Sequence, residues 1–125
     1  MADAKEKTIA LLSTTTLALN SAAQTTLYTV PVGKRCVLTH AILVAGADAS
    51  TSALTIGKVG ALTDFLGTQT LTNIDAQYDV ALMQPVPSAT VALTKSYAAG
   101  TVIQADVTTA TGGATNTLYL FGFLY

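Results

Sequence analysis

Apolar and polar residues alternate in short runs along most of the chain, and turn-forming residues separate the runs about every ten residues. The runs are rich in Val, Ile, Thr, Tyr and Leu, whereas Gly, Pro, Asn and Asp mark the breaks. Short strands at this spacing favour an all-β, antiparallel sandwich or barrel over a fold of alternating strands and helices. The pattern predicts seven or eight strands, within residues 25–30, 35–45, 53–59, 63–73, 77–83, 89–97, 101–109 and 117–125.

Two of these strands are apolar on both faces. In 117–125, Leu residues alternate with the aromatic residues Tyr119, Phe121, Phe123 and Tyr125. In 35–45, strict alternation puts one set of residues on one face, namely Cys36, Leu38, His40, Ile42 and Val44, and the other set opposite, namely Val37, Ala41 and Leu43. Strands that are apolar on both faces are normally buried on both faces.

A two-layer sandwich of 125 residues has one interior, so we expect another subunit to cover the second face of these strands. Aromatic residues are favoured at such contacts. The alternative is that some of the aromatic residues line the core of their own chain. The residues predicted for a contact between copies or with a partner are Val37, Leu43, Tyr119, Phe121, Phe123 and Tyr125.

Residues 1–20 differ in kind from the rest. The stretch "ADAKEKTIALL" is compatible with a short amphipathic helix or with an extended arm that becomes ordered on a partner. We expect a docking arm or strand, with Ile9, Leu11 and Leu12 as its contacts. Residues 21–125 then form a single domain, which is long enough to bury a core of its own.

The chain carries little charge. Its 6 Lys and Arg and 7 Asp and Glu make up 10% of the residues, and the formal net charge is −1. Soluble domains typically have about 25% charged residues. A neutral monomer is one interpretation, but we favour a protein whose surface is largely used in contacts with copies of itself or with a partner.

The same composition argues against nucleic acid and membranes as partners. The six basic residues form no cluster larger than the pair Lys34-Arg35, which is too few to neutralise many phosphates. No apolar run approaches the roughly 18 residues of a membrane span. The first seven residues are neutral in net charge and "STTT" interrupts the apolar stretch that follows, so a signal peptide is not expected.

The single cysteine, Cys36, and the single histidine, His40, are the first residues to consider for catalysis. On a strand, positions four apart share a face but lie about 13 Å from each other. A nucleophile and its base must approach to about 3 Å. We therefore expect Cys36 to be a buried structural thiol and His40 to be a core residue with one hydrogen bond, or a residue at a subunit boundary.

No other pattern in the chain predicts catalysis, a metal or a cofactor. The aspartates stand singly, and only convergence of Asp64, Asp75 and Asp79 in three dimensions would create a hydrolytic site. "TGGATN" leads into a strand, so it lacks the helix that a phosphate-binding loop requires. The sequence predicts a protein that is not an enzyme and that needs no cofactor.

Two stretches resemble tailed-bacteriophage virion proteins. "TLYTVPVGKRCVLTHAILVA" is similar to their entry into the first long strand, and "AAGTVIQADVTTATGGATNTLYLFGFLY" is similar to their closing hairpin and last strand. The resemblance implies a jelly-roll-like sandwich that decorates or cements the phage capsid as a homotrimer, bound to the major capsid protein. It also implies a location on the virion surface after synthesis in the host cytoplasm.

Related sandwiches also occur in phage tails and fibres, which leaves a second function open. In that case the chain would bind a host glycan, and the best candidates for stacking on sugar rings are Tyr78, Tyr97 and Tyr125.

Overall fold

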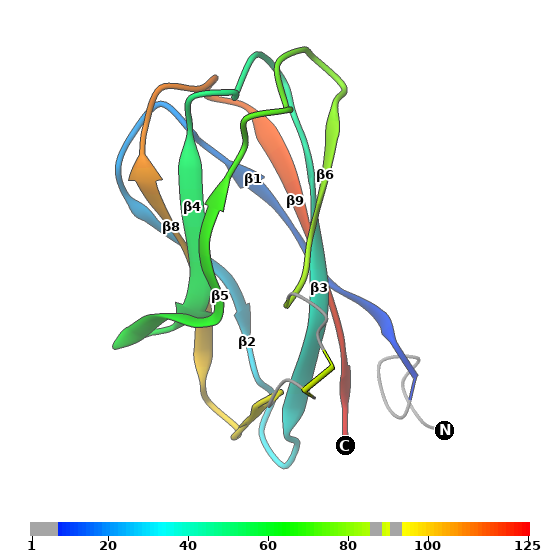
Figure 1. The fold of residues 1–125 in the computed structure, drawn as a ribbon. Coiled ribbons are helices and arrows are strands. Elements are labelled where there is room, and N and C mark those ends of the chain that lie inside the picture. Colours follow the sequence, from blue (N-terminus) through cyan, green and yellow to red (C-terminus); the bar gives the residue numbers. More distant parts are fainter. Residues whose placement is uncertain (1–7, 86–88, 91–93) are drawn as a thin grey trace.

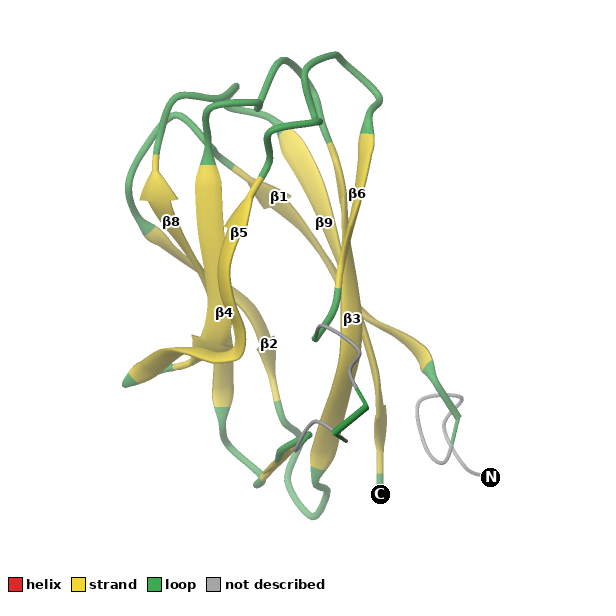
Figure 2. Ribbon diagram, in the orientation of Figure 1, coloured by secondary structure: helices red, strands yellow, loops and turns green. Residues whose placement is uncertain are grey.

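A computed structural model describes residues 8–85, 89–90 and 94–125. Two antiparallel sheets pack face to face, and the described residues include no helix (Figures 1 and 2). The strands are β1 (Ala10–Leu17), β2 (Gln24–Thr29), β3 (Cys36–Val44), β4 (Ala53–Lys58), β5 (Ala61–Thr70), β6 (Val80–Met83), β7 (Ser96–Tyr97), β8 (Val102–Thr109) and β9 (Asn116–Leu124). The predicted all-β sandwich is confirmed, with nine strands in the described residues against the seven or eight expected.

The strand order is that of a jelly roll. One sheet has the order β1-β9-β3-β6, with the two-residue β7 also paired to β3, and we call it the β3 sheet. The other, the β4 sheet, has the order β2-β8-β4-β5. With the two-residue β7 left aside, each strand lies in the other layer from the strand before it, except that β5 follows β4 in the same sheet; this is the order of the eight strands of a jelly roll.

Residues 10–17 belong to the sandwich and do not form a separate arm. They make β1, which pairs antiparallel with β9 from Ala10 opposite Gly122 to Leu17 opposite Asn116. Leu12 and Leu17 are buried in the core, and so is Leu19 beyond the strand. The boundary expected at residue 20 is thus wrong for residues 10–20, because their alternate apolar side chains complete the interior. The first seven residues of the expected arm lie outside the described residues.

A bulge in β3 changes which residues face the core. The register with β9 shifts between Leu38 and His40. Cys36 and Leu38 point inward before the bulge, and Ala41 and Leu43 point inward after it. The expectation that one face carries Cys36, Leu38, His40, Ile42 and Val44 is therefore wrong, because the extra residue reverses the alternation halfway along the strand.

The interior between the sheets is almost entirely aliphatic. It is formed by alternate residues of each strand, as the period of two requires. β9 shows this most simply, because Leu118, Leu120 and Leu124 are buried while the aromatic residues between them are not. The largest fully buried aliphatic side chains are Leu17, Leu19, Val30, Leu38, Leu43, Leu54, Ile56, Ile103, Val107, Leu118 and Leu120.

Candidate functional site

Cys36 and His40 lie on opposite faces of the β3 sheet. The thiol of Cys36 is fully buried in the interior, and desolvation raises its pKa to about 11. His40 is on the outer face, half-buried, because it follows the bulge. The prediction of a buried thiol is confirmed, whereas the interpretation of His40 as a core residue is wrong. The two side chains cannot act together.

The three aspartates considered for a hydrolytic site are dispersed. The Asp79 carboxylate accepts hydrogen bonds from the backbone N–H groups of Asp75 and Ala76 at 3.2 and 3.1 Å, so it closes the turn that precedes β6. Asp64 lies in β5 near the other end of the sandwich, where it forms an ion pair with Lys95. Acid–base chemistry shared among the three is therefore not available.

The Asp64 pair belongs to a polar cluster at that end. The hydrogen bond between the Asp64 carboxylate and Lys95 is the main reason why the pKa of Asp64 is lowered. The pKa of the Tyr97 hydroxyl is raised, mainly because the group is buried and secondly because the Asp64 carboxylate is near. Close by, Arg35 donates two hydrogen bonds to Ser96, each of 2.9 Å, one to its hydroxyl and one to its carbonyl. These contacts fasten β7 to the start of β3.

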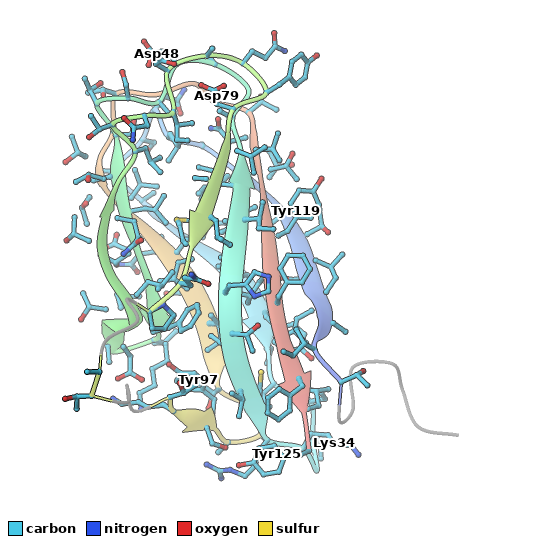
Figure 3. All side chains as sticks on the ribbon, turned by 45° about the vertical axis from the view of Figure 1, so that its right-hand side comes forward. Lys34, Asp48, Asp79, Tyr97, Tyr119 and Tyr125 are labelled. Carbon is cyan, nitrogen blue, oxygen red and sulfur yellow. The ribbon has the colours of Figure 1, made fainter. Side chains whose placement is uncertain are left out.

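The tyrosines considered for glycan binding do not share a surface. Tyr97 is buried, with 5% of its surface exposed, so it cannot stack on a sugar. Tyr78 and Tyr125 are exposed at opposite ends of β3, since the Tyr78 N–H binds the Ala45 carbonyl and the Tyr125 N–H binds the Arg35 carbonyl. Figure 3 shows Tyr125 at the lower end of the molecule. One binding site cannot contain all three.

An open groove of about 400 Å³ runs between the end of β5, the turn after it and β6. Its lining has polar amides and hydroxyls but no ionisable side chain. It therefore offers contacts of shape and hydrogen bonding, and no group that could transfer a proton. The lining residues are Gln69, Thr70, Leu71, Thr72, Asn73, Ile74, Val80, Ala81, Leu82 and Met83.

The outer face of the β3 sheet is the most distinctive surface of the molecule. Its side chains are mostly apolar or aromatic in the adjoining strands β9, β3 and β6, and no described element covers them. Figure 3, in which this sheet is turned forward, shows Tyr119 between the two ends of the sheet. We call this surface the outer patch, and its residues are Leu11, Val37, His40, Ile42, Val44, Val80, Leu82, Tyr119, Phe121 and Phe123.

Cross-strand pairing arranges the outer patch in rows. His40 is opposite Phe121, and their rings stack with centroids 4.5 Å apart and an angle of 6° between the planes. The imidazole Nδ1 lies 3.0 Å from the Thr39 hydroxyl. In the next row, Ile42 lies between Tyr119 of β9 and Leu82 of β6. Cross-strand pairs of aromatic and β-branched side chains stabilise a sheet.

Most residues predicted for contacts lie on or beside this patch. Val37, Tyr119, Phe121 and Phe123 belong to it, and Tyr125 is exposed at its end. Leu43 is in the core, because the bulge turns it inward.

The residues predicted for the docking arm divide in the same way. Ile9 has 62% of its surface exposed, Leu11 is in the outer patch, and Leu12 is in the core.

The charged side chains of the described residues avoid the outer patch and separate by sign. One end of the sandwich, the acidic end, has three carboxylates: Asp48, Asp75 and Asp79. The other, the basic end, has four cations and one carboxylate, a formal side-chain charge of +3: Lys34, Arg35, Lys58, Lys95 and Asp64. Figure 3 shows Asp48 and Asp79 at the top and Lys34 at the bottom.

No pattern in the sequence predicts this separation. Apart from the pair Lys34-Arg35, the basic residues of this end are far apart along the chain, and the fold brings them together. Among the residues that the structure describes, the remaining charged side chain is that of Asp106, on β8 in the β4 sheet.

Comparison with known proteins found no matching family model, no curated relative and no similar solved structure. Among the described residues, no three His, Cys, Asp or Glu side chains are grouped as a metal ion would require. No helix in the described part of the chain has the length and hydropathy of a membrane span.

Proposed function

We propose that this chain is a non-enzymatic structural protein of a phage virion, which binds the assembled head as a homo-oligomer and stabilises it. The observation that carries the proposal is the outer patch, an uncharged and mainly apolar surface across β9, β3 and β6. A large contiguous apolar surface on a folded domain is typical of a contact with another protein. The resemblance of residues 26–45 and 98–125 to virion proteins supplies the identity of the assembly.

The mechanism is multivalent docking. A head presents the same binding site many times, so an oligomer that holds several of these sites gains affinity without stronger individual contacts. Ile9, exposed just before β1, is the residue of the predicted docking segment that is best placed to reach a shell subunit. Leu12 has no part in docking, because it is buried in the core.

Sedimentation with phage heads tests the proposal. The purified chain is mixed with assembled heads, and separately with unassembled shell protein, both from the genome that encodes the chain. We expect it to sediment with heads and to leave the free shell protein unbound. Ile9→Asp should reduce head binding, whereas Val32→Asp, a change at another exposed apolar residue, should not. Absence of the chain from both the heads and the shell protein would refute the proposal.

A further inference from the structure

The outer patch is suited to binding a second copy of itself. Apart from the His40 imidazole and the Tyr119 hydroxyl it is apolar, so it offers few polar groups that a different partner would have to match. One central row stacks the rings of Phe121 and His40, and the next pairs the aromatic Tyr119 with the aliphatic Ile42. Two such faces can pack as sheets do in a sandwich, with side chains of the two layers interdigitating.

The size of the patch allows a weak contact. Three adjoining strands, two of nine residues and one of four, spaced about 4.8 Å apart with about 3.3 Å for each residue, give a footprint on the order of 350 Å² in each copy. A pair would bury on the order of 700 Å², which is below the usual size of a stable protein interface. We therefore expect pairs in equilibrium with single chains rather than a permanent complex.

The charges determine how the two copies are oriented. Two copies packed through the outer patch have their strands either parallel or antiparallel. The parallel arrangement puts the acidic ends side by side, with Asp48, Asp75 and Asp79 of both copies together. The antiparallel arrangement puts the acidic end of each copy next to the basic end of the other, so opposite charges face each other twice.

We propose that the outer patch binds the outer patch of a second copy, with the strands of the two copies antiparallel. The two-fold axis then passes between the row of His40 and Phe121 and the row of Ile42 and Tyr119. A surface that binds the identical surface of a second copy forms closed pairs, whereas a ring of three copies needs two different surfaces on each copy. For this face, a pair therefore replaces the trimer that the resemblance implies. The inference rests on the proposed function only in taking the outer patch to be a contact surface.

Two valine variants test the contact. Val80 is in the outer patch with 57% of its surface exposed, and Val59 is off it, in the β4–β5 turn, with 59% exposed. Sedimentation velocity across a hundredfold range of concentration should show pairs for the wild type and for Val59→Lys. Val80→Lys should weaken pairing at least tenfold, because it puts an unpaired ammonium group into an apolar contact in each copy. Leu82→Lys, at 60% exposure, should do the same.

Salt tests the orientation. Raising the NaCl concentration from about 20 to 300 mM should weaken an antiparallel pair several-fold, because it screens attraction between the ends. A parallel pair would strengthen instead. Lys34→Glu should weaken pairing at low salt and have little effect at high salt.

Single chains at all concentrations, or a trimer that Val80→Lys leaves intact, would overturn the inference. Head binding is measured separately, so failure of the pairing does not decide whether the chain binds heads.

Discussion

The side-chain oxygen of Asn116 accepts a hydrogen bond of 3.0 Å from the backbone N–H of Gly46, and this contact joins the start of β9 to the loop after β3. The amide nitrogen of the same side chain donates to the carbonyl oxygens of Leu17 and Gly113, at 3.0 and 2.9 Å. One buried polar side chain thus holds three connections at the acidic end of the sandwich.

Asn116→Ala should lower the free energy of unfolding by about 2–3 kcal/mol. The change removes three hydrogen bonds at a buried position, although the Gly113 carbonyl keeps a second bond, from the Leu19 N–H. Urea unfolding measures the effect. Asn20→Ala, at an exposed position, serves as the control and should change the stability by less than about 0.5 kcal/mol. Equal effects of the two changes would mean that the Asn116 bonds contribute nothing.

Gly122→Ala should destabilise the chain by at least about 2 kcal/mol. A Cβ at Gly122 would overlap the carbonyl oxygen of Val37, which is backbone of the neighbouring strand and cannot move aside easily. Gly67→Ala is the matched control, because a Cβ there meets open space and its backbone conformation is an ordinary one. Thermal melts of both variants distinguish them. If the Gly122→Ala variant had the melting temperature of the wild type, β3 and β9 would have to move apart around the added Cβ without a loss of stability.

The thiol of Cys36 should resist alkylation in the folded chain and react only on unfolding, because it is buried and its pKa is raised to about 11. The folded state favours the neutral thiol, so stability is full below the ordinary pKa of 9.0 and falls as the pH rises towards 11. The loss is on the order of 2 kcal/mol. Urea unfolding at pH 8, 9, 10 and 11 measures it.

Cys36→Ala should lack this component of the alkaline loss, although Tyr97, whose pKa is also raised, continues to contribute. Rapid labelling of the folded wild type at pH 8 would contradict the buried thiol.

The carboxylate of Asp64 should titrate below the usual range for aspartate, because its pKa is lowered chiefly by the hydrogen bond from Lys95. Its contribution to stability is therefore present above a pH of about 4 and is lost as the pH falls through the lowered pKa. NMR titration of the carboxyl carbon measures the value directly. Lys95→Met should raise it markedly and Lys58→Met only slightly, since Lys58 has the smallest effect of the groups that act on this carboxylate. An unchanged titration in Lys95→Met would contradict the ion pair.

Period-two alternation was enough to predict the layers of the fold, because most strands have one apolar and one polar face. It failed in β3, where residues on both sides of the strand are apolar and the polar pair Thr39-His40, one residue on each side under strict alternation, does not mark either side as the solvent face. It also missed β1, because the polar run "STTT" hides a strand whose inward positions include Leu12 and Leu17. The aromatic side of β9 was predicted correctly, since its alternation with leucine is unbroken.

The charge separation between the ends could not be predicted. It depends on which loops meet, and Lys34 and Lys95 come together only because Arg35 and Ser96 bind each other across the fold. The buried position of Tyr97 has the same origin, since β7 is only two residues long and its pairing with Cys36 and Val37 depends on long-range contacts.

The bulge in β3 makes the length of this strand as important as its composition. A chain that lacked Thr39 would need no bulge, because His40 would follow Leu38 directly and strict alternation would still turn Ala41 and Leu43 inward and Ile42 and Val44 outward. A regular strand that kept all nine residues from Cys36 to Val44 would instead turn Ala41 and Leu43 to the solvent. Relatives of this chain should therefore either have both the bulge and its extra residue or lack both, since either one alone would exchange part of the core for part of the contact surface.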